Sequence, residues 1–294
     1  TYVSAVLPFG LSLSPYVFTR LTNWVAGLIR KETGMRISVY LDDFLIGTDT
    51  KEQLEQGLGK VQKLFKELGI ILSTKKPIEI KQEAEFLGFV WSAKKKTIGV
   101  TPDRRKEYKR SVKNLLRTAQ PVSRWRSIIG KLIFLRDAIG PTLRHVRSLL
   151  KVIRGKQLKS RIVPQGEVRS DLKWWIEMLS QDRELSLIDR GVTASITTDA
   201  SNTGMGYILE LDGWRSEKSL PIKNVDKHIN SKELEALLSC LQREGDVLEN
   251  RRVIWFSDNI TARVAVMRQG TQNLGADLWQ TTKEVLDILE ARNI

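Results

Sequence analysis

Two neighbouring aspartates stand between two short apolar runs, and their carboxylates could bind metal ions. Asp42 and Asp43 follow the run at 37–41 and precede the run at 44–46. If both runs form strands of a hairpin, its tip holds two like charges that repel each other, and a divalent cation such as Mg²⁺ commonly neutralises such a pair. Two ions held this way can clamp the attacking and leaving oxygens of phosphoryl transfer. The alternative is a solvated hairpin turn, where aspartate is common.

Three further acids have a spacing that suits a second metal site. Asp199 falls late in a β-branched strand, Asp258 follows an apolar strand, and Glu233 stands at the start of an amphipathic helix. Acids at two strand ends and on one helix can meet at one edge of a sheet, which suits metal-assisted hydrolysis of a phosphodiester. Singly, the aspartates could be loop starters and Glu233 a carboxylate favoured by the helix dipole. Glu235 competes with Glu233 for the helical position.

Apolar periodicity indicates the elements that position the first pair of acids. It predicts a helix over 12–30, two strands within 36–47 and a second helix over 51–68. Further strands are expected at 69–72 and 86–91. The order of helix, hairpin, helix and two strands is typical of an α+β unit around an antiparallel sheet.

The rest of the chain changes character twice. Helices are expected from 102 to 150, with breaks at Pro121 and near Gly140, and a Trp-rich helix is expected at 170–179. Beyond residue 191 the pattern predicts a long β region, a helix, a strand from Val253 and then helices to the end. This succession positions the second group of acids in an α/β unit.

The composition points to a polyanionic partner. The 294 residues contain 48 Lys and Arg against 34 Asp and Glu, which gives a formal net charge of +14. The cations crowd the segment 94–151, where apolar residues at helical spacing separate them, so folded basic helices are expected. Nucleic acid is the usual partner of such a surface, and a solvated cationic surface is the alternative.

Several classes of protein are disfavoured by the same composition. One cysteine and two histidines argue against a disulfide framework and a structural zinc site. We find no apolar run of the length that a membrane helix needs and no signal peptide. We therefore expect an intracellular protein, cytoplasmic or nuclear, that is not secreted and has no membrane partner.

Four motifs in the first ninety residues together resemble a reverse transcriptase. Residues 7–18 resemble the segment under the incoming nucleotide and template, 40–43 the second catalytic segment, 73–76 the segment with a lysine near the nucleotide phosphates, and 85–90 the hairpin that grips the primer end. The resemblance implies that Asp42 and Asp43 are catalytic metal ligands. It also implies nucleotide or template contacts by Phe9, Gly10, Tyr40, Lys75 and Lys76, and a primer grip formed by Phe86, Leu87, Gly88 and Phe89.

The second group of acids resembles the active site of RNase H. Asp199 matches the first-strand aspartate of that family, Glu233 its first-helix glutamate and Asp258 its fourth-strand aspartate. The chain as a whole most resembles DIRS-like retrotransposons, with gypsy-type elements and pararetroviruses as near alternatives. The implied architecture is an α+β reverse transcriptase palm at 1–100, helical thumb and connection at 101–185, and an RNase H-like α/β domain at 191–294.

The resemblance also implies an activity and its cofactors. The expected activity is RNA-directed DNA polymerase with ribonuclease H (endonuclease), using Mg²⁺ with Mn²⁺ as the alternative ion. The expected partners are an RNA–DNA hybrid, an RNA template, a DNA primer and dNTPs.

Two departures from the family pattern temper this expectation. Reverse transcriptases carry a further metal-binding aspartate upstream of the motif at 7–18, and RNase H supplies a fourth acid beyond its last long helix. Neither is present in these 294 residues, and neither His145 nor His228 matches a motif that could substitute. We therefore expect little or no DNA synthesis and weak RNase H activity from this stretch. The alternative is a domesticated or decayed copy that binds nucleic acid without turnover.

Overall fold

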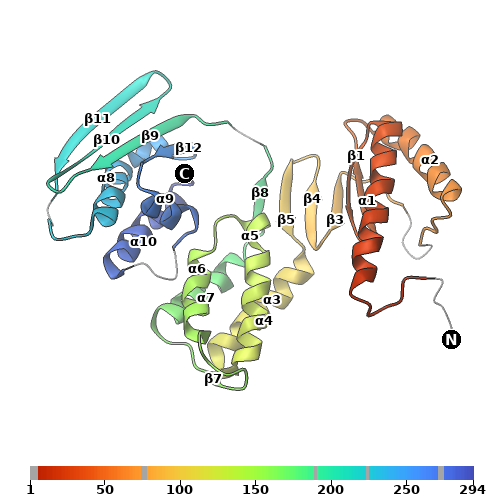
Figure 1. The fold of residues 1–294 in the computed structure, drawn as a ribbon, viewed down its shortest axis with the longest axis horizontal. Coiled ribbons are helices and arrows are strands. Elements are labelled where there is room, and N and C mark those ends of the chain that lie inside the picture. The colour runs from red at the N-terminus through yellow and green to blue at the C-terminus, as the bar shows by residue number, and fades with distance from the viewer. Residues whose placement is uncertain (1–5, 74–77, 189–190, 223–224, 271–274) are drawn as a thin grey trace. The chain divides into compact units, whose positions relative to one another are not determined.

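A computed structural model describes residues 6–73, 78–188, 191–222, 225–270 and 275–294 of the chain (Figure 1). The chain divides into two compact units, Thr1–Lys94 and Lys95–Ile294. No helix in the described parts of the chain has both the length and the apolar character needed to cross a membrane.

The described residues of the first unit form two helices and two β-hairpins. Its elements are α1 (Leu13–Thr33), β1 (Arg36–Tyr40), β2 (Asp43–Gly47), α2 (Lys51–Glu67), β3 (Glu83–Phe86) and β4 (Phe89–Ser92). Helix α1 ends at Gly34, whose φ of 71° is the left-handed conformation that glycine adopts freely. The side chain of Thr50 caps α2 by accepting a hydrogen bond from the Gln53 N–H.

One apolar core holds α1, α2 and the first hairpin together. Helix α1 packs against both β1 and α2 (Figure 1). The buried side chains of this core are those of Val25, Ala26, Ile29, Met35, Ile37, Val61, Leu64 and Phe65. Because β1 alternates buried and exposed positions, it presents Ile37 to the core while its neighbours face solvent.

The structure confirms the two predicted helices and the hairpin of this unit, and it contradicts two predicted strands. Residues 69–72 do not form a strand, and Ile71 is exposed. The run at 86–91 is not one strand, because Leu87 and Gly88, with φ values of 53° and 79°, turn the chain between β3 and β4. An apolar run fixes neither a strand partner nor the position of a turn.

Helices dominate the first half of the second unit, as the sequence predicts. They are α3 (Pro102–Arg117), α4 (Val122–Phe134), α5 (Arg136–Ile139), α6 (Arg144–Ile153) and α7 (Gly166–Met178). Four short strands accompany them: β5 (Thr97–Val100), β6 (Gln120–Pro121), β7 (Arg161–Ile162) and β8 (Glu184–Ser186). The completely buried tryptophans Trp125 of α4 and Trp175 of α7 fill the helical core.

A four-stranded mixed sheet forms the second half of this unit. Its elements are β9 (Ala194–Ala200), β10 (Gly204–Leu211), β11 (Trp214–Pro221), α8 (Ile229–Leu248), β12 (Val253–Phe256), α9 (Ile260–Met267) and α10 (Ala276–Ala291). The strand order is β11-β10-β9-β12; β10 is antiparallel to both neighbours, whereas β12 runs parallel to β9. Helix α8 connects β11 to β12 and packs on β9 and β10, and α10 packs on α8.

Charged side chains join the helical half of this unit to α10. Arg144 of α6 pairs with Asp287 and Glu290 of α10. The next residue, His145, places Nδ1 2.9 Å from Asp171 Oδ1 and Nε2 3.6 Å from Glu290 Oε2. The imidazole also stacks on the ring of Trp174, with 3.7 Å between ring centroids.

This junction makes stability depend on pH. Burial opposes the charged imidazole, but hydrogen bonds with Asp171 and Glu290 outweigh burial and raise the pKa of His145. A raised pKa stabilises the fold fully below the unfolded value of about 6.5, and that contribution is lost as pH rises through the folded value. We therefore expect His145→Gln to lose more stability at pH 5.5 than at pH 8.5. Urea unfolding at both pH values measures this, and a deficit independent of pH would contradict it.

Candidate metal-binding sites

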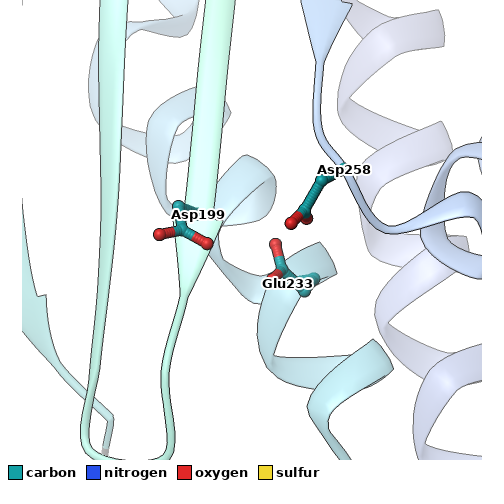
Figure 2. Close-up of side chains that lie close together, drawn as sticks. All are labelled: Asp199, Glu233 and Asp258. Atoms are coloured by element: carbon teal, nitrogen blue, oxygen red, sulfur yellow. The ribbon is translucent and has the colours of Figure 1, made fainter.

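The structure brings Asp199, Glu233 and Asp258 together at one edge of the mixed sheet. Asp199 lies near the end of β9, Asp258 lies just after β12, and Glu233 lies in the second turn of α8. Because β9 and β12 are parallel neighbours, their carboxyl ends meet at the same edge. One carboxylate oxygen from each residue lies within 4.8 Å of the other two. Figure 2 shows the three side chains pointing toward one another.

Glu233 is the buried member of this group. Its relative exposure is 4%, whereas both aspartates are exposed. Burial, followed by repulsion from Asp199 and Asp258, raises the pKa of Glu233 to about 7, although a hydrogen bond from the Ala200 backbone opposes the rise. Its buried Oε2 has no hydrogen-bond partner among the described residues. A buried carboxylate oxygen without a partner, facing two more carboxylates, is the donor set that a hard divalent cation binds.

Glu235, the alternative to Glu233, does not belong to the cluster, and the two histidines lie elsewhere. Glu235 forms an ion pair with Lys227 instead of joining the cluster. His228 caps α8, because its Nδ1 accepts a hydrogen bond from the Asn230 N–H at 3.2 Å. His145 belongs to the junction of α6, α7 and α10 described above.

Polar residues that flank the acids were missed at the sequence level. Lys232 is 2% exposed beside Glu233. Asn259, next to Asp258, caps α9 through a hydrogen bond from the Ala262 N–H to its Oδ1. The only available signal was the asparagine before a helix start, which is a typical N-cap.

The other aspartate pair lies at the tip of the β1–β2 hairpin. Tyr40 pairs with Asp43 across a turn of Leu41 and Asp42, and Leu41 has a φ of 52°, which is rare for a branched residue. Both Asp42 and Asp43 are exposed, so the tip is open to solvent. In the described residues, the one group of three acids close enough to share an ion is the cluster at Asp199.

The other residues implied by the reverse transcriptase resemblance lie in the first unit with different exposures. Phe9 is fully exposed, Tyr40 is 56% exposed and Gly10 has a φ of 86°. Lys75 and Lys76 lie outside the described residues.

The four residues expected to grip the primer form the turn between β3 and β4. Phe86 ends β3, Leu87 and Gly88 make the turn, and Phe89 begins β4. Phe89 is buried, whereas Leu87 is exposed. The segment is therefore a hairpin, the form that the motif at 85–90 resembles.

Comparison with known proteins identifies a family that the first part of the chain matches. Residues 1–91 match the model of the family described as reverse transcriptase (RNA-dependent DNA polymerase). The chain is 28% identical over 227 residues to Polyprotein P3 of Commelina yellow mottle virus, covering 75% of this chain and 11% of that protein. It is 25% identical over 280 residues to the retrovirus-related Pol polyprotein from transposon gypsy of Drosophila melanogaster, covering 90% of this chain and 26% of that protein. The chain therefore spans a minor part of the length of both polyproteins.

Solved structures share the fold over nearly the whole chain. The foamy viral protease-reverse transcriptase in complex with dsDNA matches with a TM-score of 0.53 and 20% identity, over 97% of this chain and 57% of that chain. The same enzyme in complex with an RNA/DNA hybrid matches with a TM-score of 0.52 and 20% identity, over 95% of this chain and 37% of that chain. Residues 1–91 are therefore a reverse transcriptase domain, and the chain is homologous to the polyproteins of gypsy-type retrotransposons and pararetroviruses.

Proposed function

We propose that the chain is part of a retroelement RNA-directed DNA polymerase whose residues 191–294 act as a metal-dependent ribonuclease H. The observation that carries the RNase H assignment is Glu233: a buried carboxylate that faces Asp199 and Asp258 and whose Oε2 has no hydrogen-bond partner among the described residues. Burying such a group is unfavourable unless something neutralises it. The donor set fits Mg²⁺, with Mn²⁺ as the alternative, because all three ligand atoms are carboxylate oxygens.

The topology of the mixed sheet supports the same assignment. Three antiparallel strands followed by a helix and a parallel fourth strand place one acid on the first strand, one on the helix and one after the fourth strand. This is the arrangement that the resemblance to RNase H implies for Asp199, Glu233 and Asp258.

The three acids differ in exposure, and we assign them different roles accordingly. A bound divalent cation activates water and stabilises the charge that develops on the phosphate. Asp199 and Asp258 are exposed, so they would hold the ion where a nucleic acid can reach it. Glu233 is buried, so it would supply a ligand that is shielded from water. An exposed site of this kind suits a polymeric substrate, which can reach the ion without entering a cavity.

For the polymerase, we propose that Asp42 and Asp43 hold metal at the hairpin tip. The support is the family match over residues 1–91 and the open position of both carboxylates. The dNTP and the primer end would meet the segments around Phe9, Tyr40 and Phe86–Phe89. The gypsy-type and pararetroviral relatives agree with a retroelement origin, and the DIRS-like assignment stays a prediction.

The partner we propose is an RNA–DNA hybrid with its template and primer. Basic side chains on α3 and α4 face solvent, among them Lys106, Arg110, Arg117, Arg124 and Arg126. Such helices suit the phosphates of an A-like duplex, which proteins recognise through shape and backbone. We propose that three parts of the chain share these functions: the palm at 1–100, the thumb and connection at 101–185, and the RNase H-like domain at 191–294.

Separate substitutions at the two sites test the proposal. The purified chain is given a hybrid with labelled RNA, and a primed template with dNTPs, in Mg²⁺ or Mn²⁺. We expect Asp199→Asn to remove RNA cleavage and to leave hybrid binding unchanged. Any primer extension should be lost in Asp42→Asn and retained in Asp199→Asn.

Two outcomes of these assays would count against the proposal. Cleavage that persists in Asp199→Asn would contradict the RNase H assignment. Salt-dependent binding of the hybrid with no turnover in either metal would favour the alternative, a decayed copy that binds nucleic acid.

A further inference from the structure

The residues beside Glu233 reach both of the segments that carry the other two acids. Lys232 is 2% exposed, and its Nζ donates hydrogen bonds to the backbone oxygens of Asn202 at 3.2 Å and Val225 at 2.7 Å. Asn202 lies three residues after Asp199, in the turn between β9 and β10. Lys232 therefore ties the turn that follows Asp199 to the start of α8.

That turn is also closed by its own hydrogen bonds. The Ser201 N–H donates to the Gly204 oxygen at 2.7 Å, and the Gly204 N–H donates to Ser201 Oγ at 3.0 Å. A closed turn moves as one piece. Anchoring its Asn202 oxygen to Lys232 therefore restrains the nearby end of β9, where Asp199 is located.

A second side chain of the same helical turn reaches the loop of Asp258. Asn230 Oδ1 accepts a hydrogen bond from Asn259 Nδ2 at 2.9 Å. The Asn259 N–H also donates to Ser257 Oγ at 3.1 Å, and its Oδ1 caps α9. These three hydrogen bonds restrain Asn259, and they therefore also restrain its neighbour Asp258.

A buried lysine that makes no ion pair with the cluster needs a physical reason. Lysine is rarely buried, because removing the ammonium from water is unfavourable unless hydrogen bonds replace the lost solvation. Two backbone carbonyls supply that replacement here: that of Asn202, in the loop after Asp199, and that of Val225, in the loop before α8. Three carboxylates within 4.8 Å repel one another, so these loops would separate if nothing held them.

We propose that Lys232 and Asn230 are positioning residues, which hold the Asp199 turn and the Asp258 loop around Glu233 at the separation that a divalent cation needs. The inference rests on the proposed metal-dependent function. Lys232 restrains one side of the site and Asn230 the other, so metal affinity depends on both although neither touches the ion.

Direct measurement of Mn²⁺ affinity in the full chain, without nucleic acid, tests this inference. Titration calorimetry compares the wild type with Lys232→Met, which keeps most of the length of the side chain and removes the ammonium, and with Asn230→Ala. We expect each variant to bind Mn²⁺ about 10-fold or more weakly, because outer partners of metal ligands typically contribute 10–100-fold. Lys227→Met is the matched control: its lysine pairs with Glu235 outside the cluster, so its affinity should equal that of the wild type.

Hybrid cleavage as a function of Mn²⁺ gives the second readout. Saturating Mn²⁺ should restore kcat in Lys232→Met and Asn230→Ala, because their ligands are intact, and should not restore it in Glu233→Gln. If Lys232→Met does not fold, Asn230→Ala carries the test, since it removes one hydrogen bond at a half-buried position.

The outcomes distinguish a failure of the positioning roles from a failure of the proposed function. A wild type that binds Mn²⁺, with both variants binding equally well, would overturn the positioning roles and leave the proposed function standing. A wild type that shows neither Mn²⁺ binding nor metal-dependent cleavage would overturn the proposed function itself.

Discussion

Glu233→Gln is expected to abolish hybrid cleavage and, in the absence of metal, to make the protein more stable. Glutamine keeps the shape of the side chain but removes the charge that a cation would bind. Cleavage should fall by more than about 100-fold, since even outer partners of metal ligands contribute up to about that factor. A gel assay of the RNA strand at saturating Mg²⁺ measures the loss.

The gain in stability follows from the direction of the pKa shift. Folding raises the pKa of Glu233 from 4.5 to about 7, so the folded state keeps a proton that the unfolded chain has released. Stability therefore falls as pH rises through this window, and the penalty is complete above about pH 7. Because the glutamine side chain cannot ionise, Glu233→Gln should be more stable than the wild type in EDTA at pH 8, by on the order of 3 kcal/mol.

Bound metal should reverse the order of stability, so that the wild type becomes more stable than Glu233→Gln. A cation that binds the folded wild type stabilises it by mass action, whereas the variant has lost a ligand. Melting curves in EDTA and in 10 mM Mg²⁺, on the order of concentrations that fill weak carboxylate sites, should therefore cross. Equal stabilisation of both proteins by Mg²⁺ would contradict the role of Glu233 as a ligand.

Trp175→Ala is expected to destabilise the helical half of the second unit strongly. Trp175 is completely buried, and its Nε1 donates a hydrogen bond to the His145 backbone oxygen at 3.0 Å. It also packs edge-on against Trp174, with 5.1 Å between ring centroids. Truncation leaves a cavity and an unsatisfied carbonyl, so the free energy of unfolding should fall by about 3–5 kcal/mol.

Two matched variants separate the contributions. Trp175→Phe keeps most of the volume and loses the hydrogen bond, so it should cost about 1–2 kcal/mol. Trp174→Ala removes a half-buried ring that stacks on His145 and should cost less than Trp175→Ala. Urea unfolding followed by circular dichroism gives these values; a loss below about 1 kcal/mol for Trp175→Ala would contradict the packing described here.

Much of the fold could be predicted because the spacing of apolar residues indicates which face of a helix or strand is buried. The hairpin around Asp42 and Asp43 follows from two apolar runs with a polar tip, and the helices at 12–30 and 51–68 follow from their apolar faces. Strands are harder to predict from a local pattern, because a strand forms only when its backbone pairs with that of another strand. The run at 69–72 is apolar without being a strand, and Leu87–Gly88 breaks another run into a hairpin.

The three acids of the second site could be predicted by type and order, but their environment could not. Asp199, Glu233 and Asp258 stand at element ends that the sequence indicates, so their convergence follows from the topology. The burial of Glu233 depends on how α8 packs on β9 and β10, which no local pattern shows. The same holds for Lys232, whose carbonyl partners lie 30 and 7 residues away along the chain.

Direct observation of an ion at the three acids tests the central claim. Crystals of the chain soaked in MnCl₂ and measured at a wavelength with strong manganese anomalous scattering would show where the metal binds. We predict an anomalous peak about 2.1 Å from carboxylate oxygens of Asp199, Glu233 and Asp258, the distance typical of small hard cations. The peak should be absent in Glu233→Gln crystals soaked alongside. Wild-type crystals with no peak at this cluster would contradict the assignment of a metal-dependent nuclease site.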